Sequence, residues 1–242
     1  MEAGYGSSAG RVRETNEDTI WCGERLAVVA DGMGGAAGGE VASRLAVETL
    51  KGWRLPPPHM PARAIEEELL RAVHAANQEI YDRALAEPSL RGMGTTLTVA
   101  VLSDLAVIVA HVGDSRAYRV VGGRLQQITA DHSVVGELMR SGGLSPAEAR
   151  RHPYRNMLTR ALGTARHVEV DVHRVAVKAG EGILLCTDGL TNTLSDSEIE
   201  AVIAGERDAQ ACVDALIAAA NARGAPDNVS AILLYPGGSQ RD

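Results

Sequence analysis

Four aspartates in this chain share one sequence context, although they lie far apart along it. Each stands where a predicted strand begins or ends, beside glycine or asparagine; they are Asp31, Asp114, Asp188 and Asp227. Ends of adjacent strands meet at one edge of a sheet, so we expect these carboxylates to converge there. Their oxygen atoms favour a hard ion, Mg²⁺ or Mn²⁺, over zinc, and no cysteine or histidine cluster offers an alternative.

Carboxylates crowded in this way repel one another, and bound cations would remove that repulsion. Two such ions about 3.5–4 Å apart can bridge a water molecule and lower its pKa, which gives a hydroxide nucleophile at neutral pH. The alternative for each aspartate is a turn or a helix cap, which is a common use of this residue. The functional interpretation predicts metal-assisted hydrolysis.

Residues 11–18 form a second polar cluster, with two arginines and three acids in eight residues. An arginine fork for a phosphate, beside carboxylates for a metal, is one interpretation of this pattern. A solvated loop is the other, because charge clusters are usually exposed. These residues alone leave both interpretations open.

The elements that must position these residues follow from hydrophobic periodicity and turn signals. The apolar run 26–30 predicts a buried strand that ends on Asp31 and pairs with a short strand at 19–22. A glycine-rich turn through Gly39 then leads into a helix. The other predicted elements are a weak edge strand within 1–10, helices 40–53 and 61–86, strands 95–102, 106–112, 117–121, 124–128, 168–177 and 182–186, helices 195–204 and 208–223, and a last strand 229–234.

Residues 131–163 differ from the rest, because they are polar and rich in arginine. Ser145 to Glu148 is a capping box, so we expect an excursion with one short helix. Connections of this length are usually functional. No linker or second boundary is evident, so residues 1–242 are expected to form one domain into which this segment is inserted.

Composition narrows the class of protein. The chain has 242 residues, is 45% hydrophobic and carries a formal net charge of −7. The acidic balance argues against nucleic acid or an anionic membrane as the main partner. Three widely spaced cysteines indicate reduced thiols and a cytoplasmic protein. We expect no signal peptide and no membrane span, because the required apolar runs are missing.

Six short motifs, taken in order, resemble those of the metal-dependent protein phosphatases, the PPM or type 2C family, and in particular its bacterial members. Each motif is weak alone, but six in order over nearly the whole chain are specific. The borders of residues 131–163 also resemble those of the bacterial flap segment. The motifs are Arg-x-x-Asn-Glu-Asp at 13–18, Asp-Gly-Met-Gly-Gly at 31–35, Gly-Thr-Thr at 94–96, Gly-Asp-Ser-Arg at 113–116, Thr-Asp-Gly-Leu at 187–190 and Asp-Asn at 227–228.

The resemblance implies an α+β fold, a four-layer α-β-β-α sandwich of two antiparallel sheets flanked by helix pairs, with a flap subdomain at about 131–163. It also implies a role for each matching residue at the metal end of the sandwich. Those roles are Asp31 bridging two core Mn²⁺ or Mg²⁺ ions, Asp188 and Asp227 completing the first site, the Gly32 carbonyl binding the second ion, Glu17 and Asp18 acting mostly through water, Asp114 helping Asp188 to hold a third ion, and Arg13 binding the phosphate.

One position departs from many relatives, which have a histidine where this chain has Met33. Histidine there is proposed to protonate the leaving group, whereas methionine has no proton to give. We therefore assign no general acid. His132 and His152, which flank or lie in the flap, are expected to be structural.

The resulting expectation is a Mg²⁺/Mn²⁺-dependent phosphatase of phosphoserine and phosphothreonine in proteins. We expect it to be bacterial, cytoplasmic and monomeric, to oppose a Ser/Thr kinase, and to bind no nucleic acid or membrane. An inactive binding module of the same fold should have lost metal aspartates, which this chain retains. A regulatory phosphatase for one partner is a second alternative. A metal nuclease is disfavoured because the chain lacks a basic groove.

Overall fold

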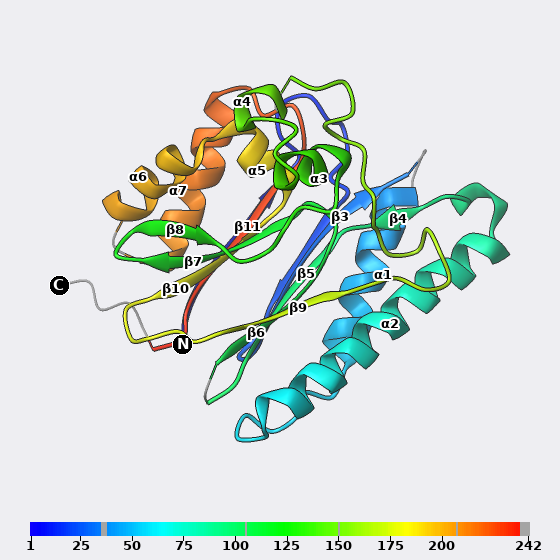
Figure 1. Ribbon diagram of the computed structural model, residues 1–242, viewed down its shortest axis with the longest axis horizontal. Helices are drawn as coiled ribbons and strands as arrows, with labels where there is room; N and C mark the ends of the chain where they lie inside the picture. The colour runs from blue at the N-terminus through cyan, green and yellow to red at the C-terminus, as the bar shows by residue number, and fades with distance from the viewer. Residues whose placement is uncertain (35–37, 105, 150, 207, 238–242) are drawn as a thin grey trace.

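The computed structural model of the protein describes residues 1–34, 38–104, 106–149, 151–206 and 208–237. Two antiparallel sheets lie face to face at its centre, and helices cover the outer face of each (Figure 1). The predicted four-layer α-β-β-α sandwich is therefore confirmed. Residues 35–37 of the predicted glycine-rich turn lie outside the described ranges.

The first sheet has five strands, and three helices cover it rather than the expected pair. The additional helix, α5, starts directly after Thr187, so Asp188 lies in its first turn, where a negative charge is favourable. The preceding strand, β10, ends at Cys186 as predicted, but the short helix that follows it was not predicted. In spatial order the strands are β1 (Glu2–Ser8), β11 (Val229–Tyr235), β10 (Gly182–Cys186), β7 (Arg116–Val121) and β8 (Arg124–Gln127), and the helices are α5 (Asp188–Thr193), α6 (Asp196–Gly205) and α7 (Ala209–Ala222).

The second sheet is covered by α1 and α2, on the right in Figure 1. Its strand β3 does not end on Asp31 as predicted, because Gly32 and Met33 pair with Thr95 and Gly94 of β4. In spatial order its strands are β2 (Asp18–Cys22), β3 (Leu26–Met33), β5 (Leu97–Leu102), β6 (Val107–Val112) and β9 (Asp171–Val175), and the short β4 (Gly94–Thr95) pairs with the end of β3. The helices are α1 (Gly38–Gly52), α2 (Ala62–Ala86) and the 3₁₀ turn η1 (Pro88–Leu90).

Alternation along the strands explains why both faces of each sheet are buried. Successive side chains point to opposite faces of a strand. In β3, Val28 and Ala30 join the core beneath α1 and α2, whereas Ala27 and Val29 join the core between the sheets. Because these strands are apolar on both faces, they form the middle layers of the sandwich.

Residues 131–163, here called the flap, lie between β8 and β9 at the upper end of the molecule in Figure 1. The flap contains two helices, α3 (Val134–Arg140) and α4 (Pro146–Ala149), so the prediction of one helix was incomplete. The Ser133 side chain caps α3 by accepting the Gly136 N–H. The predicted capping box at α4 is present, since the Ser145 N–H donates to the Glu148 carboxylate at 2.8 Å.

Two buried polar side chains fasten the flap to the sandwich. Asn77 of α2 donates to the carbonyls of Ala165 and Arg166 and accepts the Gly163 N–H at 2.9 Å. His132 accepts the Gly113 N–H on Nδ1 and contacts the Asp171 carboxylate through Nε2 at 3.2 Å. This pairing identifies His132 as a structural residue that supports the turn before Asp114.

Candidate metal centre

A pocket of about 290 Å³ lies at the end of the sandwich that carries the flap. Segments from both sheets meet there: the end of β3, the β6–β7 turn, the start of α5 and the residues before β11. All the residues predicted for the site line this pocket except Asp18. Its lining is Arg13, Glu17, Asp31, Gly32, Met33, Gly34, Thr96, Asp114, Asn156, Leu158, Asp188, Asp227 and Asn228.

Asp18 lies behind the pocket, paired with Asp31 across β2 and β3. Its Oδ2 atom accepts hydrogen bonds from the Thr187 hydroxyl at 2.9 Å and the Ser230 hydroxyl at 2.7 Å. Its Oδ1 atom is buried and has no hydrogen-bond partner among the described residues. Burial is the main cause that raises the pKa of Asp18 to about 7. The side chain therefore lacks one partner that a cation or its water shell would supply.

Asp31 is held by its backbone. Its N–H donates to the Thr96 hydroxyl at 2.9 Å, and its carbonyl accepts the Thr96 N–H and the Thr95 hydroxyl, each also at 2.9 Å. Burial raises its pKa well above the usual value, and the nearby acids, Asp18 first, raise it further. These contacts hold the backbone at Asp31, and the neighbouring acids oppose the negative charge of its side chain.

Asp188 and Asp114 extend the cluster on the far side of the pocket. Asn192, one turn later in α5, donates to the Asp188 carboxylate at 2.9 Å. Burial and the charge of Asp227 raise the pKa of Asp188. Burial and the charge of Asp188 raise that of Asp114 well above its usual value. Carboxylates that oppose one another's ionisation in this way have the electrostatic character of a cation site.

Arg13 forms an ion pair with one member of this cluster. Its guanidinium binds both oxygens of Asp227, with Nη2–Oδ2 and Nε–Oδ1 distances of 3.0 Å. The hydrogen bond and the charge of Asp227 raise the pKa of Arg13. The predicted phosphate ligand and a predicted metal ligand thus form an ion pair with each other.

Asn228 joins the N-terminal loop to this pocket. Its side-chain oxygen accepts the Glu17 N–H at 2.9 Å, and its amide donates to the carbonyls of Ala9 and Thr15. Burial raises the pKa of Glu17, which lines the pocket. The motif at 227–228 indicated this residue, but sequence reasoning gave it no role. Sequence reasoning likewise gave no role to the hydroxyls and amide that hold Asp18, Asp31 and Asp188.

Glycines beside two of the aspartates allow the chain segments to come close enough for convergence. A Cβ at Gly32 would lie 2.1 Å from the carbonyl oxygen of Gly39. A Cβ at Gly189 would lie 1.9 Å from that of Asn228. Because no side chain fits at these distances, glycine is required where β3 meets α1 and where α5 meets the residues before β11.

The donor set fits a hard divalent cation, because it is made of oxygen atoms, is strongly acidic and includes the unpartnered Oδ1 of Asp18. Within the described ranges, no three His, Cys, Asp or Glu side chains are already gathered to hold one ion. An ion at this site would therefore need the side chains to move closer together, and Asp227 starts from its ion pair with Arg13. Met33 lines the pocket without a proton to donate.

A two-sheet sandwich with acidic side chains from both sheets at one end is the arrangement expected of a metal-dependent protein phosphatase. The family model "Protein phosphatase 2C" matches residues 6–233, and the chain belongs to this family. The Serine/threonine phosphatase stp of Listeria monocytogenes is 39% identical over 240 residues, which are 97% of this chain and 95% of that protein.

Solved structures show the same likeness. The serine/threonine phosphatase PstP/Ppp of Mycobacterium tuberculosis is 36% identical, with a TM-score of 0.88 over 96% of this chain and 98% of that one. A structure of the PstP catalytic domain in complex with two manganese ions is 35% identical, with a TM-score of 0.85 over 96% of each chain. The predicted family and enzyme class, a protein-serine/threonine phosphatase, are therefore confirmed, and phosphorylated proteins are its substrate class. In the part of the chain that the structure describes, every helix is too short or too polar to cross a bilayer.

Proposed function

We propose that this enzyme hydrolyses phosphoserine and phosphothreonine in proteins with Mn²⁺ or Mg²⁺, by in-line attack of water on phosphorus and without a phosphoenzyme. The observation that carries the proposal is the meeting of Asp31, Asp188 and Asp227 from distant segments in one pocket. The manganese ions of the PstP catalytic domain support the choice of metal.

The pocket residues divide into ligands of two core ions and ligands of a third. When bound, the core ions activate water as the nucleophile and offset negative charge on the phosphoryl group. The proposed ligands are Asp31 for both core ions, Asp188 and Asp227 for the first, the Gly32 carbonyl for the second, Glu17 and Asp18 through water, and Asp114 with Asp188 for the third.

Arg13 is proposed to bind the substrate phosphate. Its guanidinium already binds the two oxygens of the Asp227 carboxylate through two N–H groups. Phosphate oxygens accept the same bidentate pair of hydrogen bonds from arginine. Arg13 is half-exposed at the mouth of the pocket, so it can turn from Asp227 toward a ligand. No side chain is assigned as the acid for the leaving alkoxide, since Met33 occupies the position expected for one.

The proposal extends to the cellular setting. One domain, residues 1–242 with the flap at 131–163, is proposed to act as a cytoplasmic monomer that opposes a Ser/Thr kinase. The cysteines support a reducing compartment, because Cys22 and Cys186 are free thiols and Cys186 and Cys212 are buried.

An assay of the purified protein on a phosphothreonine peptide tests the metal site. We expect phosphate release with Mn²⁺, none after EDTA, and recovery on adding Mn²⁺ back. Asp31→Asn should reduce release to background while circular dichroism stays unchanged, because the change keeps the side-chain shape and removes the bridging charge. Asp104→Asn, in the exposed β5–β6 turn, is the matched control. Full activity of Asp31→Asn would refute the assignment.

A further inference from the structure

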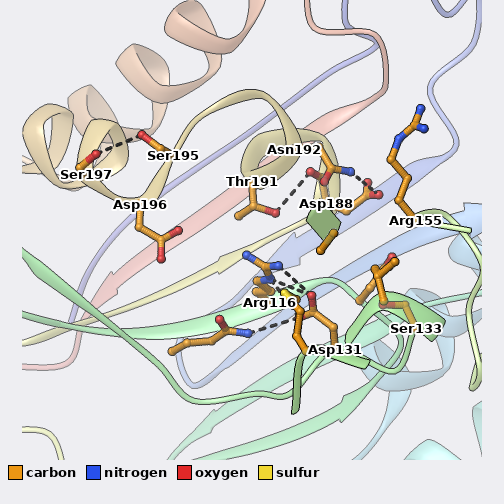
Figure 2. Close-up of a pocket in the computed structure, with 15 residues that line it drawn as sticks. Arg116, Asp131, Ser133, Arg155, Asp188, Thr191, Asn192, Ser195, Asp196 and Ser197 are labelled. Atoms are coloured by element: carbon orange, nitrogen blue, oxygen red, sulfur yellow. Dashed lines mark hydrogen bonds and ion pairs between the residues drawn. The ribbon is translucent and has the colours of Figure 1, made fainter. Parts of the chain in front are cut away.

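A second pocket, of about 530 Å³, adjoins the metal centre and has no role in the chemistry described so far. The two pockets share Asp114 and Asp188 in their linings. Its volume is within the range of cavities that hold small ligands or side chains. A protein segment whose phosphoresidue enters the metal centre can therefore place a flanking side chain in this second pocket, which Figure 2 shows.

The walls of this pocket differ in character. The flap contributes an apolar wall made of Val135 and Met139 of α3 and Ala149 of α4. Opposite lies a polar wall at the α5–α6 junction, and between them the Arg116–Asp131 ion pair forms part of the lining. The polar wall consists of Thr191, Asn192, Ser195, Asp196 and Ser197. An occupant with an apolar stem and a polar end matches both walls.

Most charges around this pocket are already neutralised within the protein. Arg116 binds Asp131 through Nη2 at 2.7 Å and through Nε at 2.9 Å. On α6, Glu198 is bound by the Ser195 backbone and hydroxyl, and Glu200 by Arg124 and the Leu125 N–H. Asp114 and Asp188 belong to the metal centre. These acids therefore offer little net charge to a substrate.

Asp196 and Arg155 are the exceptions among the charges that line the pocket. Asp196 is exposed and lies at the first position of α6, and in the described residues neither its side chain nor that of Arg155 takes part in a hydrogen bond or ion pair with another side chain. Figure 2 shows Asp196 and Arg155 on opposite sides of the pocket, with Arg155 on the side of Asp188. The negative charge therefore faces the end of the pocket that is remote from the metal centre.

We propose that this pocket receives a lysine or arginine side chain that flanks the phosphoresidue of the substrate. The aliphatic stem packs on Val135 and Met139, and the cationic head binds Asp196 and the neighbouring serine hydroxyls. Long cationic side chains bury their stems and keep their charge at a wet rim, which this pocket provides. The inference rests on the proposed function, and it makes Asp196 a residue that determines substrate specificity.

The test uses phosphothreonine peptides that differ only by arginine, glutamine or glutamate at one position from −4 to +4. Hydrolysis is measured with the full chain and Mn²⁺ at fixed ionic strength. At one position we expect arginine to raise kcat/KM about tenfold over glutamine, mainly through KM. Asp196→Asn should reduce this preference to less than about twofold, and Asp196→Lys should reverse it toward glutamate.

Two controls separate this inference from the proposed function. Hydrolysis of p-nitrophenyl phosphate, which has no flanking residue, should be unchanged in both Asp196 variants, and Asp104→Asn should keep the arginine preference. Absence of Mn²⁺-dependent hydrolysis of every peptide by the wild type would overturn the proposed function. The specificity proposal falls if peptides are hydrolysed without arginine preference, or if the preference survives Asp196→Asn. A glutamate preference that Arg155→Gln removes would assign the pocket to acidic substrates instead.

Discussion

Asp18 and Asp31 illustrate how single side chains of the metal centre affect stability. Both are carboxylates whose pKa is raised by burial and by acidic neighbours, and Asp18 has a buried oxygen without a hydrogen-bond partner among the described residues. Without a cation, each costs free energy when it ionises. The same clustered carboxylates that favour a divalent ion therefore lower the stability of the protein when no ion is bound.

Metal-free stability should consequently decrease as pH rises. A raised pKa means that the folded protein holds protons that the unfolded chain has released, so stability present below about pH 4 is lost as pH rises through about 7. In EDTA we expect Tm to fall by several degrees between pH 5 and pH 8, and Mn²⁺ to flatten the curve. Differential scanning fluorimetry measures both. A metal-free Tm that rises over this interval would contradict the assignment of raised pKa values.

Arg13→Ala should weaken substrate binding more than the chemical step. A charge-assisted hydrogen bond contributes about 1.5–3 kcal/mol, so we expect KM for a phosphothreonine peptide to rise roughly tenfold or more while kcat changes less. Arg11→Ala, an exposed neighbour in the same loop, provides the control. Steady-state kinetics that leave KM unchanged would count against the phosphate role.

For single residues, the sequence identified the charged side chains of the site but not the polar groups that hydrogen-bond to them. Strand-end aspartates beside glycine are visible in the sequence, and the family motifs order them. Thr96 and Thr187 lie in two of these motifs, but the motifs do not say what their hydroxyls contact, and Ser230 lies outside all six. Their roles depend on which strand lies beside which, and only the fold supplies that information.

Among the elements, those with strong periodicity were predicted well. β10 has the predicted bounds, and α2 ends at Ala86 as expected. The helices α3 and α5 were missed because each has fewer than eight residues and no apolar stripe long enough to signal a helix. Both are stabilised by their surroundings: the Ser133 cap in α3, and burial of Leu190 in α5.

Asn77 shows how one element holds another in place. Its buried amide makes three hydrogen bonds with the chain that leaves the flap. Asn77→Ala would leave these backbone groups without partners, and we expect it to lower the free energy of unfolding by about 2–4 kcal/mol. Urea unfolding measures the loss. His74→Ala, on the exposed face of the same helix, should change stability by less than about 0.5 kcal/mol; an equal loss in both variants would argue against a specific anchor.

On the scale of the whole molecule, the metal centre lies where the two sheets meet. Asp31 belongs to the sheet covered by α1 and α2, whereas Asp188 and Asp227 adjoin strands of the other sheet. Periodicity in the sequence predicts strands but not their assignment to a sheet. The convergence of the four aspartates was therefore anticipated from strand ends, but the expectation of a single sheet edge was wrong, because the aspartates come from both sheets.

With the roles proposed above, the ion pair between Arg13 and Asp227 couples metal binding to phosphate binding. We expect a divalent ion that binds Asp227 to weaken its hold on the guanidinium, and an anion that binds the guanidinium to weaken its hold on the carboxylate. By thermodynamic reciprocity, each ligand then raises the affinity of the other by the same factor. Metal loading of this phosphatase should thus be tightest when phosphorylated protein is abundant, and the product phosphate should delay metal loss after turnover.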